Sequence, residues 1–135
     1  MKVLFVCNGN VGRSPMAEAF FNKLSKKGSA SSAGVIVAAK GNVGKPTNIL
    51  NITVMNEMGC DLSRHKRRQL TEAMVKASDI VVFMGTQSKM PGYLRKSKKV
   101  KLWRIRDPKR QSMAVRRLIR NKIKTKVQSL IGWIG

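Results

Sequence analysis

The chain has 135 residues, 42% of them hydrophobic, and its 28 lysines and arginines against six aspartates and glutamates give a formal net charge of +22. This length suffices for a single domain with a buried core, expected to span residues 1–135, and no apolar run reaches the roughly 18 residues of a membrane-spanning helix. Two cysteines, Cys7 and Cys60, are too few for a disulfide framework. Disulfide-stapled secreted folds are therefore excluded, and a reducing cytoplasm is the expected compartment.

The first predicted elements surround a cysteine. The apolar and β-branched residues 2–6 predict a buried strand that leads directly into Cys7. After a short loop with two glycines, Ser14 and Pro15 predict the start of a helix, because serine caps helix N-termini and proline is tolerated at the first helical position. Beyond that helix, residues 30–33 predict a second short strand.

Strands and helices alternate along the rest of the chain. The patterns predict a surface loop over residues 35–46 and a helix capped by Thr47 over 47–58. They then predict a strand over 79–84, a short helix over 88–94, a strand over 100–105 and a long final helix over 113–134. Such alternation is typical of parallel strands joined by helical crossovers, so we expect an α/β three-layer sandwich with a four-stranded parallel sheet. Ligands of such sheets bind beyond the carboxyl ends of the strands. Cys7 and Asp107, which follow the first and last strands, are therefore expected on one rim.

The loop after the first strand carries residues suited to oxyanion chemistry. Five residues separate Cys7 from Arg13, enough for the chain to curl into a cup in which both side chains face one tetrahedral oxyanion. A helix N-terminus and a guanidinium favour the thiolate, and the planar fork of arginine grips two phosphoryl oxygens at once. Gly9 and Gly12 permit unusual backbone angles and close approach, and Asn10 tolerates the left-handed region. The alternative for Cys7 is a buried core cysteine.

Segments along the whole chain resemble one family. The segment Val6-Cys7-Asn8-Gly9-Asn10-Val11-Gly12-Arg13-Ser14-Pro15 resembles the phosphate-binding loop of low-molecular-weight protein tyrosine phosphatases and of the related thioredoxin-coupled arsenate reductases. The resemblance continues in Met16-Ala17-Glu18-Ala19, Ser31-Ser32-Ala33-Gly34, Met58-Gly59-Cys60-Asp61-Leu62-Ser63, His65-Lys66-Arg67-Arg68-Gln69-Leu70, Ala77-Ser78-Asp79-Ile80-Val81-Val82 and Trp103-Arg104-Ile105-Arg106-Asp107-Pro108. It implies the phosphotyrosine phosphatase I-like fold, which has a flavodoxin-like topology.

The resemblance implies a covalent mechanism that needs no metal ion and no other cofactor. Cys7 would attack phosphorus to form a phosphocysteine, while Arg13 and the loop amides stabilise the equatorial oxygens. Asp107, in the matching Asp-Pro, would protonate the leaving oxygen and then activate water, the alternative being a turn aspartate before a proline. The implied phosphate-binding residues are Asn8, Gly9, Asn10, Val11, Gly12, Arg13 and Ser14, and the implied loop-supporting residues are Asn10, Ser14, Ser32 and His65.

The chain departs from the family pattern at two kinds of position. Gly12 stands where the family usually carries a second loop cysteine, and residues 83–88 contain none, so the electron relay of the arsenate reductases is incomplete. Cys7 is accordingly expected to be less protected from overoxidation. In place of the aromatic residues that flank phosphotyrosine in the family, the chain has Val35-Ile36 and Lys109-Arg110. The basic replacements favour anionic substrates, and the loss of the aromatic residues reduces the surface on which a phenyl ring could stack.

The expected function is that of a cysteine-dependent phosphatase acting on phosphomonoesters, with phosphorylated protein, above all phosphotyrosine, or a small aryl phosphate as substrate. Two alternatives stay open: an arsenate reductase of the same fold, and a basic protein that binds nucleic acid or another polyanion. The last is favoured by charge, because 21 of the 28 basic side chains follow residue 60, and such a surface binds polyanions in a salt-dependent way. Candidate phosphate contacts on the final helix are Arg116, Arg117, Arg120, Lys122, Lys124 and Lys126.

Overall fold

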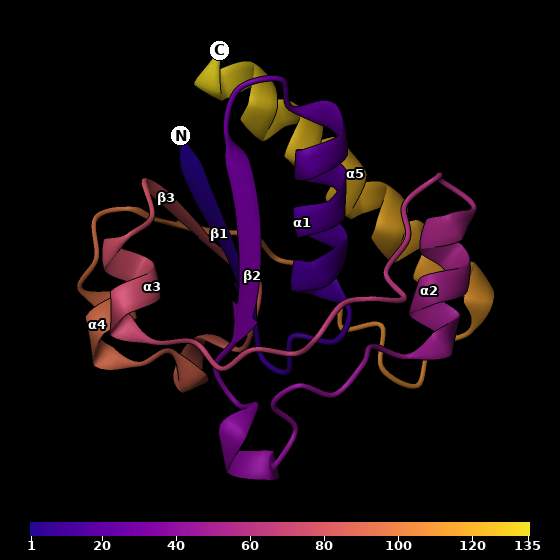
Figure 1. Ribbon diagram of the computed structural model, residues 1–135, viewed down its shortest axis with the longest axis horizontal. Coiled ribbons are helices and arrows are strands. Elements are labelled where there is room, and N and C mark those ends of the chain that lie inside the picture. Colours follow the sequence, from indigo (N-terminus) through magenta and orange to yellow (C-terminus); the bar gives the residue numbers. More distant parts are fainter.

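The computed structural model describes all 135 residues, and strands alternate with helices along them (Figure 1). The strands are β1 (Lys2–Cys7), β2 (Ser29–Gly34), β3 (Ile80–Phe83) and β4 (Val100–Leu102). The α-helices are α1 (Arg13–Leu24), α2 (Ile49–Asn56), α3 (Glu72–Lys76), α4 (Gly92–Arg95) and α5 (Met113–Ile134), and the short 3-10 helices are η1 (Ala38–Lys40) and η2 (Gln87–Lys89). None of the helices combines the length and the apolarity needed to cross a membrane.

The four strands are parallel and form one sheet in the order β2-β1-β3-β4. In the register of the central strand, Cys7 lies opposite Gly34 of β2, and Val6 lies opposite Phe83 of β3. Because all strands run in one direction, their carboxyl ends share one edge, which is the lower edge in Figure 1. This confirms the predicted α/β fold with a four-stranded parallel sheet.

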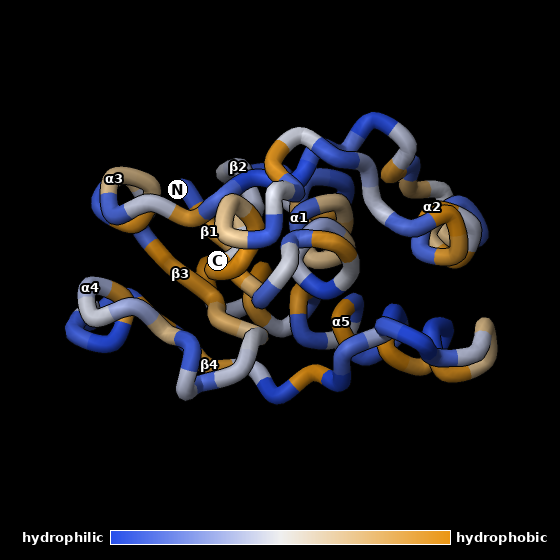
Figure 2. Tube along the Cα trace, turned by 90° about the horizontal axis from the view of Figure 1, so that it is seen from below, coloured by the Kyte–Doolittle hydropathy of each residue, from blue (hydrophilic) through white to orange (hydrophobic).

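Helices cover both faces of the sheet, so the fold is a three-layer sandwich. Val3 and Phe5 pack on the side of α1 and α5, whereas Leu4 and Val6 pack on the side of α3 and α4. None of these four residues is more than 1% exposed. Figure 2 likewise shows β3 as a hydrophobic segment enclosed by the two helical layers. Burial on both faces explains why the central strands β1 and β3 read as apolar runs rather than as alternating ones, whereas the edge strands β2 and β4 contain polar residues.

Helix α2 starts one residue later than expected, because a different side chain caps it. Its N-cap is Asn48, whose Oδ1 accepts a hydrogen bond from the N–H of Leu50 at 2.8 Å. Thr47, the predicted cap, instead donates its hydroxyl to the carbonyl oxygen of Val11 in the loop after β1. The predicted cap therefore supports a distant loop.

Other boundaries shift for local reasons. Helix α1 begins at Arg13 with Gly12 as its N-cap. Ser14 therefore lies inside the first turn, and its prediction as the N-cap was wrong. The last strand ends at Leu102 rather than at residue 105. The five residues of α3 were not predicted, because they are too few to show a helical hydrophobic period.

Two of the arginines proposed as phosphate contacts on α5, Arg116 and Arg120, are buried, and a third, the exposed Arg117, is held in an ion pair. Arg116 is 3% exposed and donates to Oδ1 of Asn51 at 2.6 Å. Arg120, which is 7% exposed, and Arg117 both pair with the carboxylate of Glu57, at 2.6 and 2.8 Å. These contacts join α5 to the segment around α2, and the burial of Arg116 and Arg120 makes them unsuited to an outer surface that binds polyanions.

The Glu57 cluster makes the stability of the fold depend on pH in a defined window. Hydrogen bonds from Arg117, and then from Arg120, lower the pKa of Glu57 from its ordinary 4.5 to about 2. A carboxyl group with a depressed folded-state pKa stabilises the fold above its unfolded-state pKa, and this stabilisation is lost as the pH falls toward the folded-state value. We expect Glu57→Gln to lower the Tm at neutral pH, and we expect the difference from the parent to shrink as the pH falls through about 2. Thermal unfolding across this range measures the effect, and a difference that is constant with pH would contradict it.

Candidate active site

The segment from Cys7 to Ser14 forms a cup between the end of β1 and the first turn of α1. Its carbonyl oxygens are all occupied. Backbone N–H groups bind three of them: Val35 donates to Cys7, Ile36 to Asn8 and Met16 to Gly12. Side chains bind the other three: Arg67 donates to Gly9, His65 to Asn10 and Thr47 to Val11. In contrast, the N–H groups of residues 8–14 donate to no acceptor within the protein. A ring of free N–H groups at a helix N-terminus is suited to bind an anion.

Asn10 holds the cup in shape from behind. Its backbone has a φ of 55°, as its tolerance of the left-handed region predicted, whereas neither Gly9 nor Gly12 has a positive φ. Its side-chain amide donates to Oγ of Ser14 at 2.9 Å and to Oγ of Ser32 at 3.0 Å. Its Oδ1 accepts from the N–H of Arg68 at 2.9 Å, and the residue is fully buried. Every polar atom of the side chain is therefore used, which fixes the loop.

The sulfur of Cys7 lies 2.9 Å from Oγ of Ser14. Because that Oγ already accepts from Asn10, its own hydrogen is free to point at the sulfur. The competing acceptor, the carbonyl oxygen of Ala33, is more distant at 3.5 Å. The Ser14 hydroxyl is therefore placed to stabilise a thiolate at Cys7, together with the N-terminus of α1.

Arg13 and Asp107 meet at the rim although they are far apart in sequence. One terminal nitrogen of Arg13 donates to the carbonyl oxygens of Met84 at 2.7 Å and Ile105 at 3.2 Å. The other lies 3.6 Å from Oδ2 of Asp107, whose side chain is 53% exposed. Oδ1 of Asp107 accepts from the N–H of Lys109 at 3.0 Å. The carboxylate is thus held in a defined turn while one of its oxygens stays accessible.

Cys7 and Asp107 line one cavity of about 640 Å³. The cup contributes Asn8, Gly9, Val11, Gly12 and Arg13 to the same cavity, while Asn10, Ser14, Ser32 and His65 support the cup by hydrogen bonds. The structure therefore brings together all the residues that the sequence singled out for the site. No aromatic side chain lines the cavity.

Gly12 is the point at which the loop that carries Asp107 closes on the cup. A Cβ atom at position 12 would lie 2.5 Å from Cγ of Pro108 and 3.3 Å from Nδ2 of Asn51. Pro108 therefore occupies the space in which a side chain at position 12 would stand.

The other thiol lies away from the cavity. Cys60 is 6% exposed, and burial raises the pKa of its thiol. It follows Gly59, whose carbonyl oxygen accepts from Nζ of Lys23 in the last turn of α1 at 3.2 Å. Cys7, in contrast, contacts the first turn of that helix. The two free thiols thus lie toward opposite ends of α1.

Some contributors to the site were not recognised from the sequence. Thr47 and Asn51 both donate to the carbonyl oxygen of Val11, Asn51 at 3.5 Å. Arg67 donates its Nε to the carbonyl oxygen of Gly9 at 2.9 Å, and its partial burial lowers the pKa of its guanidinium. These side chains approach the cup from distant segments, so no local pattern distinguishes them.

Fold and cup together place a cysteine beside a ring of free backbone amides at the carboxyl edge of a flavodoxin-like sheet, an arrangement suited to an enzyme that acts on a tetrahedral oxyanion. The family model described as "Low molecular weight phosphotyrosine protein phosphatase" matches residues 2–134. The chain belongs to this family.

Individual relatives agree with the family match. The "Probable low molecular weight protein-tyrosine-phosphatase EpsP" of Ralstonia solanacearum is 36% identical over 87 residues, which cover 64% of this chain but only 57% of that protein. The "Glutaredoxin arsenate reductase" of Synechocystis sp. is 28% identical over 135 residues, covering 99% of this chain and 98% of that protein. Among solved structures, Vibrio vulnificus Wzb in complex with benzylphosphonate superimposes with a TM-score of 0.87 at 27% identity, covering 97% of both chains.

Proposed function

We propose that this protein is a cysteine-dependent phosphatase that hydrolyses phosphomonoesters through a phosphocysteine intermediate. The proposal rests above all on the ring of unpaired N–H groups of residues 8–14, with the sulfur of Cys7 held by Ser14 in the same cup. Such a ring stabilises the three equatorial oxygens of a phosphoryl group in the transition state. The guanidinium of Arg13, fixed by two carbonyl oxygens, adds a positive charge at the rim.

In the first step, the thiolate of Cys7 attacks phosphorus in line with the ester oxygen. A sulfur–phosphorus bond forms as the phosphorus–oxygen ester bond breaks, and Asp107 gives its proton to the departing oxygen. Asp107 suits this role because it lines the cavity of Cys7 and keeps an exposed carboxyl group.

In the second step, the carboxylate of Asp107 accepts a proton from a water molecule, whose oxygen attacks phosphorus. The sulfur–phosphorus bond breaks, inorganic phosphate leaves and the thiolate of Cys7 is regenerated. The hydroxyl of Ser14, 2.9 Å from the sulfur, stabilises the thiolate as a leaving group in this step.

We place phosphorylated protein, above all phosphotyrosine, and aryl phosphates ahead of arsenate as substrates. The Wzb neighbour was solved with benzylphosphonate, in which a phenyl ring carries the phosphonate through one carbon. Arsenate reduction consumes two electrons from thiols, yet Cys7 is the only thiol in the cup and Pro108 fills the space next to Gly12. The two free thiols fit a reducing compartment, and we propose the cytoplasm.

The test is hydrolysis of an aryl phosphate and a phosphotyrosine peptide in excess chelator, with arsenate plus thioredoxin as the comparison. We expect both esters to be hydrolysed and Cys7→Ser to lose about 10⁴-fold or more of the activity, because the nucleophile is removed. Cys60→Ser is the matched control and is expected to retain activity. Hydrolysis that survives in Cys7→Ser would refute the mechanism, and thioredoxin-dependent arsenate consumption without ester hydrolysis would favour the reductase.

A further inference from the structure

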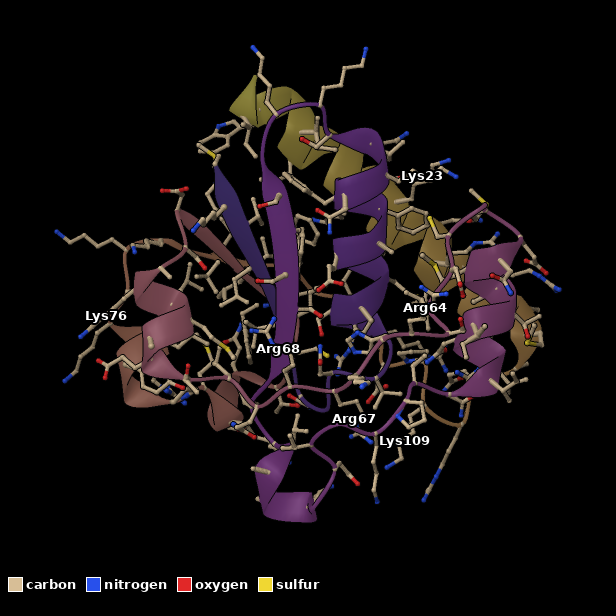
Figure 3. The ribbon with its side chains drawn as sticks, viewed as in Figure 1. Lys23, Arg64, Arg67, Arg68, Lys76 and Lys109 are labelled. Atoms are coloured by element: carbon tan, nitrogen blue, oxygen red, sulfur yellow. The ribbon has the colours of Figure 1, made fainter.

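Basic side chains are concentrated on the walls of the Cys7 cavity beyond what the composition explains. They make up 28 of the 135 residues of the chain but seven of the 18 that line this cavity, where Asp107 is the only acidic residue. Besides Arg13, they are Lys40, Arg67, Lys89, Lys109, Arg110 and Arg116. In Figure 3, Arg67 and Lys109 lie close together below the carboxyl edge of the sheet. The mouth of the cavity is therefore strongly positive.

Most of this charge is not needed to hold the fold. Arg67 and Arg116 have structural contacts, to the carbonyl oxygen of Gly9 and to Asn51. The charged ends of the other four residues form no hydrogen bond and no ion pair within the protein: Lys40, Lys89, Lys109 and Arg110. Gathering unpaired like charges around an opening opposes folding. An anionic ligand accounts for the arrangement.

The turn that follows Asp107 is built to present two of these charges. Arg110 has a φ of 62°, in the left-handed region that is unfavourable for a long side chain. The turn is held by the hydrogen bond from the N–H of Lys109 to Asp107 and by one from the N–H of Gln111 to the carbonyl oxygen of Pro108, both 3.0 Å long. Backbone strain of this kind persists where surrounding contacts impose it and is concentrated at functional sites.

The cup and the cavity walls are suited to bind different parts of a substrate. The amides of residues 8–14 and Arg13 already match one phosphoryl group. The cavity offers no aromatic side chain on which a phenyl leaving group could stack. Recognition of the leaving group is therefore left to the outer cations, above all Lys109 and Arg110.

We propose that the preferred substrates are phosphotyrosine peptides with aspartate or glutamate next to the phosphotyrosine, whose carboxylates pair with Lys109 and Arg110. This inference rests on the proposed phosphatase function and defines the substrate class of the same site. It differs from binding to the basic surface at large, because it requires charges within the Cys7 cavity.

The test compares two phosphotyrosine peptides that differ only in carrying glutamate or glutamine on both sides of the phosphotyrosine. At low salt, kcat/KM is expected to be at least about tenfold higher for the glutamate peptide, and the ratio is expected to fall toward ~1 near 1 M salt, where the Debye length is about 3 Å. The double variant Lys109→Asn/Arg110→Asn is expected to reduce the low-salt ratio to about 2 or less. Asparagine tolerates the left-handed backbone at position 110 and keeps the N–H of position 109 for Asp107.

The matched control is Lys76→Asn/Lys98→Asn, which removes the same charge from two exposed positions outside the cavity. Lys76 is the last residue of α3, which lies far from Lys109 in Figure 3. This control is expected to keep the full preference for the glutamate peptide. A control that loses the preference as completely as the cavity variant would overturn the proposal in favour of a general effect of net charge.

The proposal and the phosphatase function fail separately. Equal kcat/KM for the two peptides at low salt would overturn the substrate preference while leaving ester hydrolysis established. If neither peptide is hydrolysed, the proposed phosphatase function is refuted. The preference for the glutamate peptide is then tested by measuring the binding of the two peptides. Fluorescence anisotropy with Cys7→Ser is then expected to show about tenfold tighter binding of the glutamate peptide, lost in the Lys109/Arg110 background, and equal binding would overturn it.

Discussion

Replacing Arg13 by lysine is expected to lower kcat/KM for an aryl phosphate by about 10²–10³-fold, the usual cost of losing a preorganised donor to transition-state charge. In the structure one terminal nitrogen of Arg13 binds the carbonyl oxygens of Met84 and Ile105, while the other faces Asp107 at 3.6 Å. A lysine carries a single compact charge, so it cannot bind the two carbonyl oxygens and face Asp107 at the same time, nor can it donate to two phosphoryl oxygens in parallel. Steady-state kinetics measures the loss.

Arg64→Lys is the matched control for this substitution. Arg64 is exposed and lies outside the cavity, away from Arg67 and Lys109 in Figure 3. We expect this variant to stay within about twofold of the parent, since exposed arginines rarely contribute measurably. Parent-like kinetics in Arg13→Lys would remove Arg13 from transition-state stabilisation, provided that its thermal unfolding shows a folded protein.

Replacing Asp107 by asparagine is expected to slow the hydrolysis of phenyl phosphate by about 10²–10³-fold, within the range of general acid–base catalysis. An ester of a strongly acidic phenol needs no protonation of its leaving oxygen, so its first step is expected to remain fast. Its second step still lacks the base that activates water. Rapid mixing is therefore expected to show a burst of phenol release followed by slow turnover, as the phosphocysteine accumulates.

The Asp107→Asn substitution tests the acid–base role alone, because asparagine can preserve the turn formed by Asp107 and Lys109. Its Oδ1 accepts the same hydrogen bond that Asp107 now accepts from the N–H of Lys109. Asp61→Asn serves as the control, since Asp61 accepts from the N–H of Ser63 in an equivalent two-residue turn and is exposed outside the cavity. An equal rate loss for good and poor leaving groups, without a burst, would argue against an acid–base role for Asp107.

The parts of the protein that were predictable from sequence are those encoded in consecutive residues. The strand, the cup and the first helix follow one another between Lys2 and Leu24, so the cup and its cysteine were apparent from spacing alone. The final helix spans 113–134 as expected, because a capping Ser112 precedes a long amphipathic period. The placement of Cys7 and Asp107 on one rim was expected from the shared carboxyl edge of parallel strands, and both residues line one cavity there.

The remaining features depend on pairings across long stretches of chain. Thr47 has the sequence context of a helix cap, yet its hydroxyl is bound 36 residues away at Val11. Arg116 and Arg120 lie in a strongly basic stretch, but their burial depends on Asn51 and Glu57 of the segment around α2. Amino-acid type and spacing do not specify such partners, because the same arginine is favourable both in solvent and in a buried hydrogen-bonded position.

The absence of a second thiol in the cup is expected to leave Cys7 without an internal means of repair. When Cys7 is oxidised to a sulfenic acid, a neighbouring thiol would ordinarily capture it as a disulfide, from which the thiol can be recovered. Position 12 is a glycine and offers no such thiol, and Cys60 lies toward the other end of α1. Rescue must come from a small thiol that enters the cavity of about 640 Å³, whose cationic walls favour an anionic one. We therefore expect the recovery of Cys7 after oxidation to depend on the surrounding thiol pool, and reversible inactivation by peroxide through a Cys7–Cys60 disulfide would contradict this.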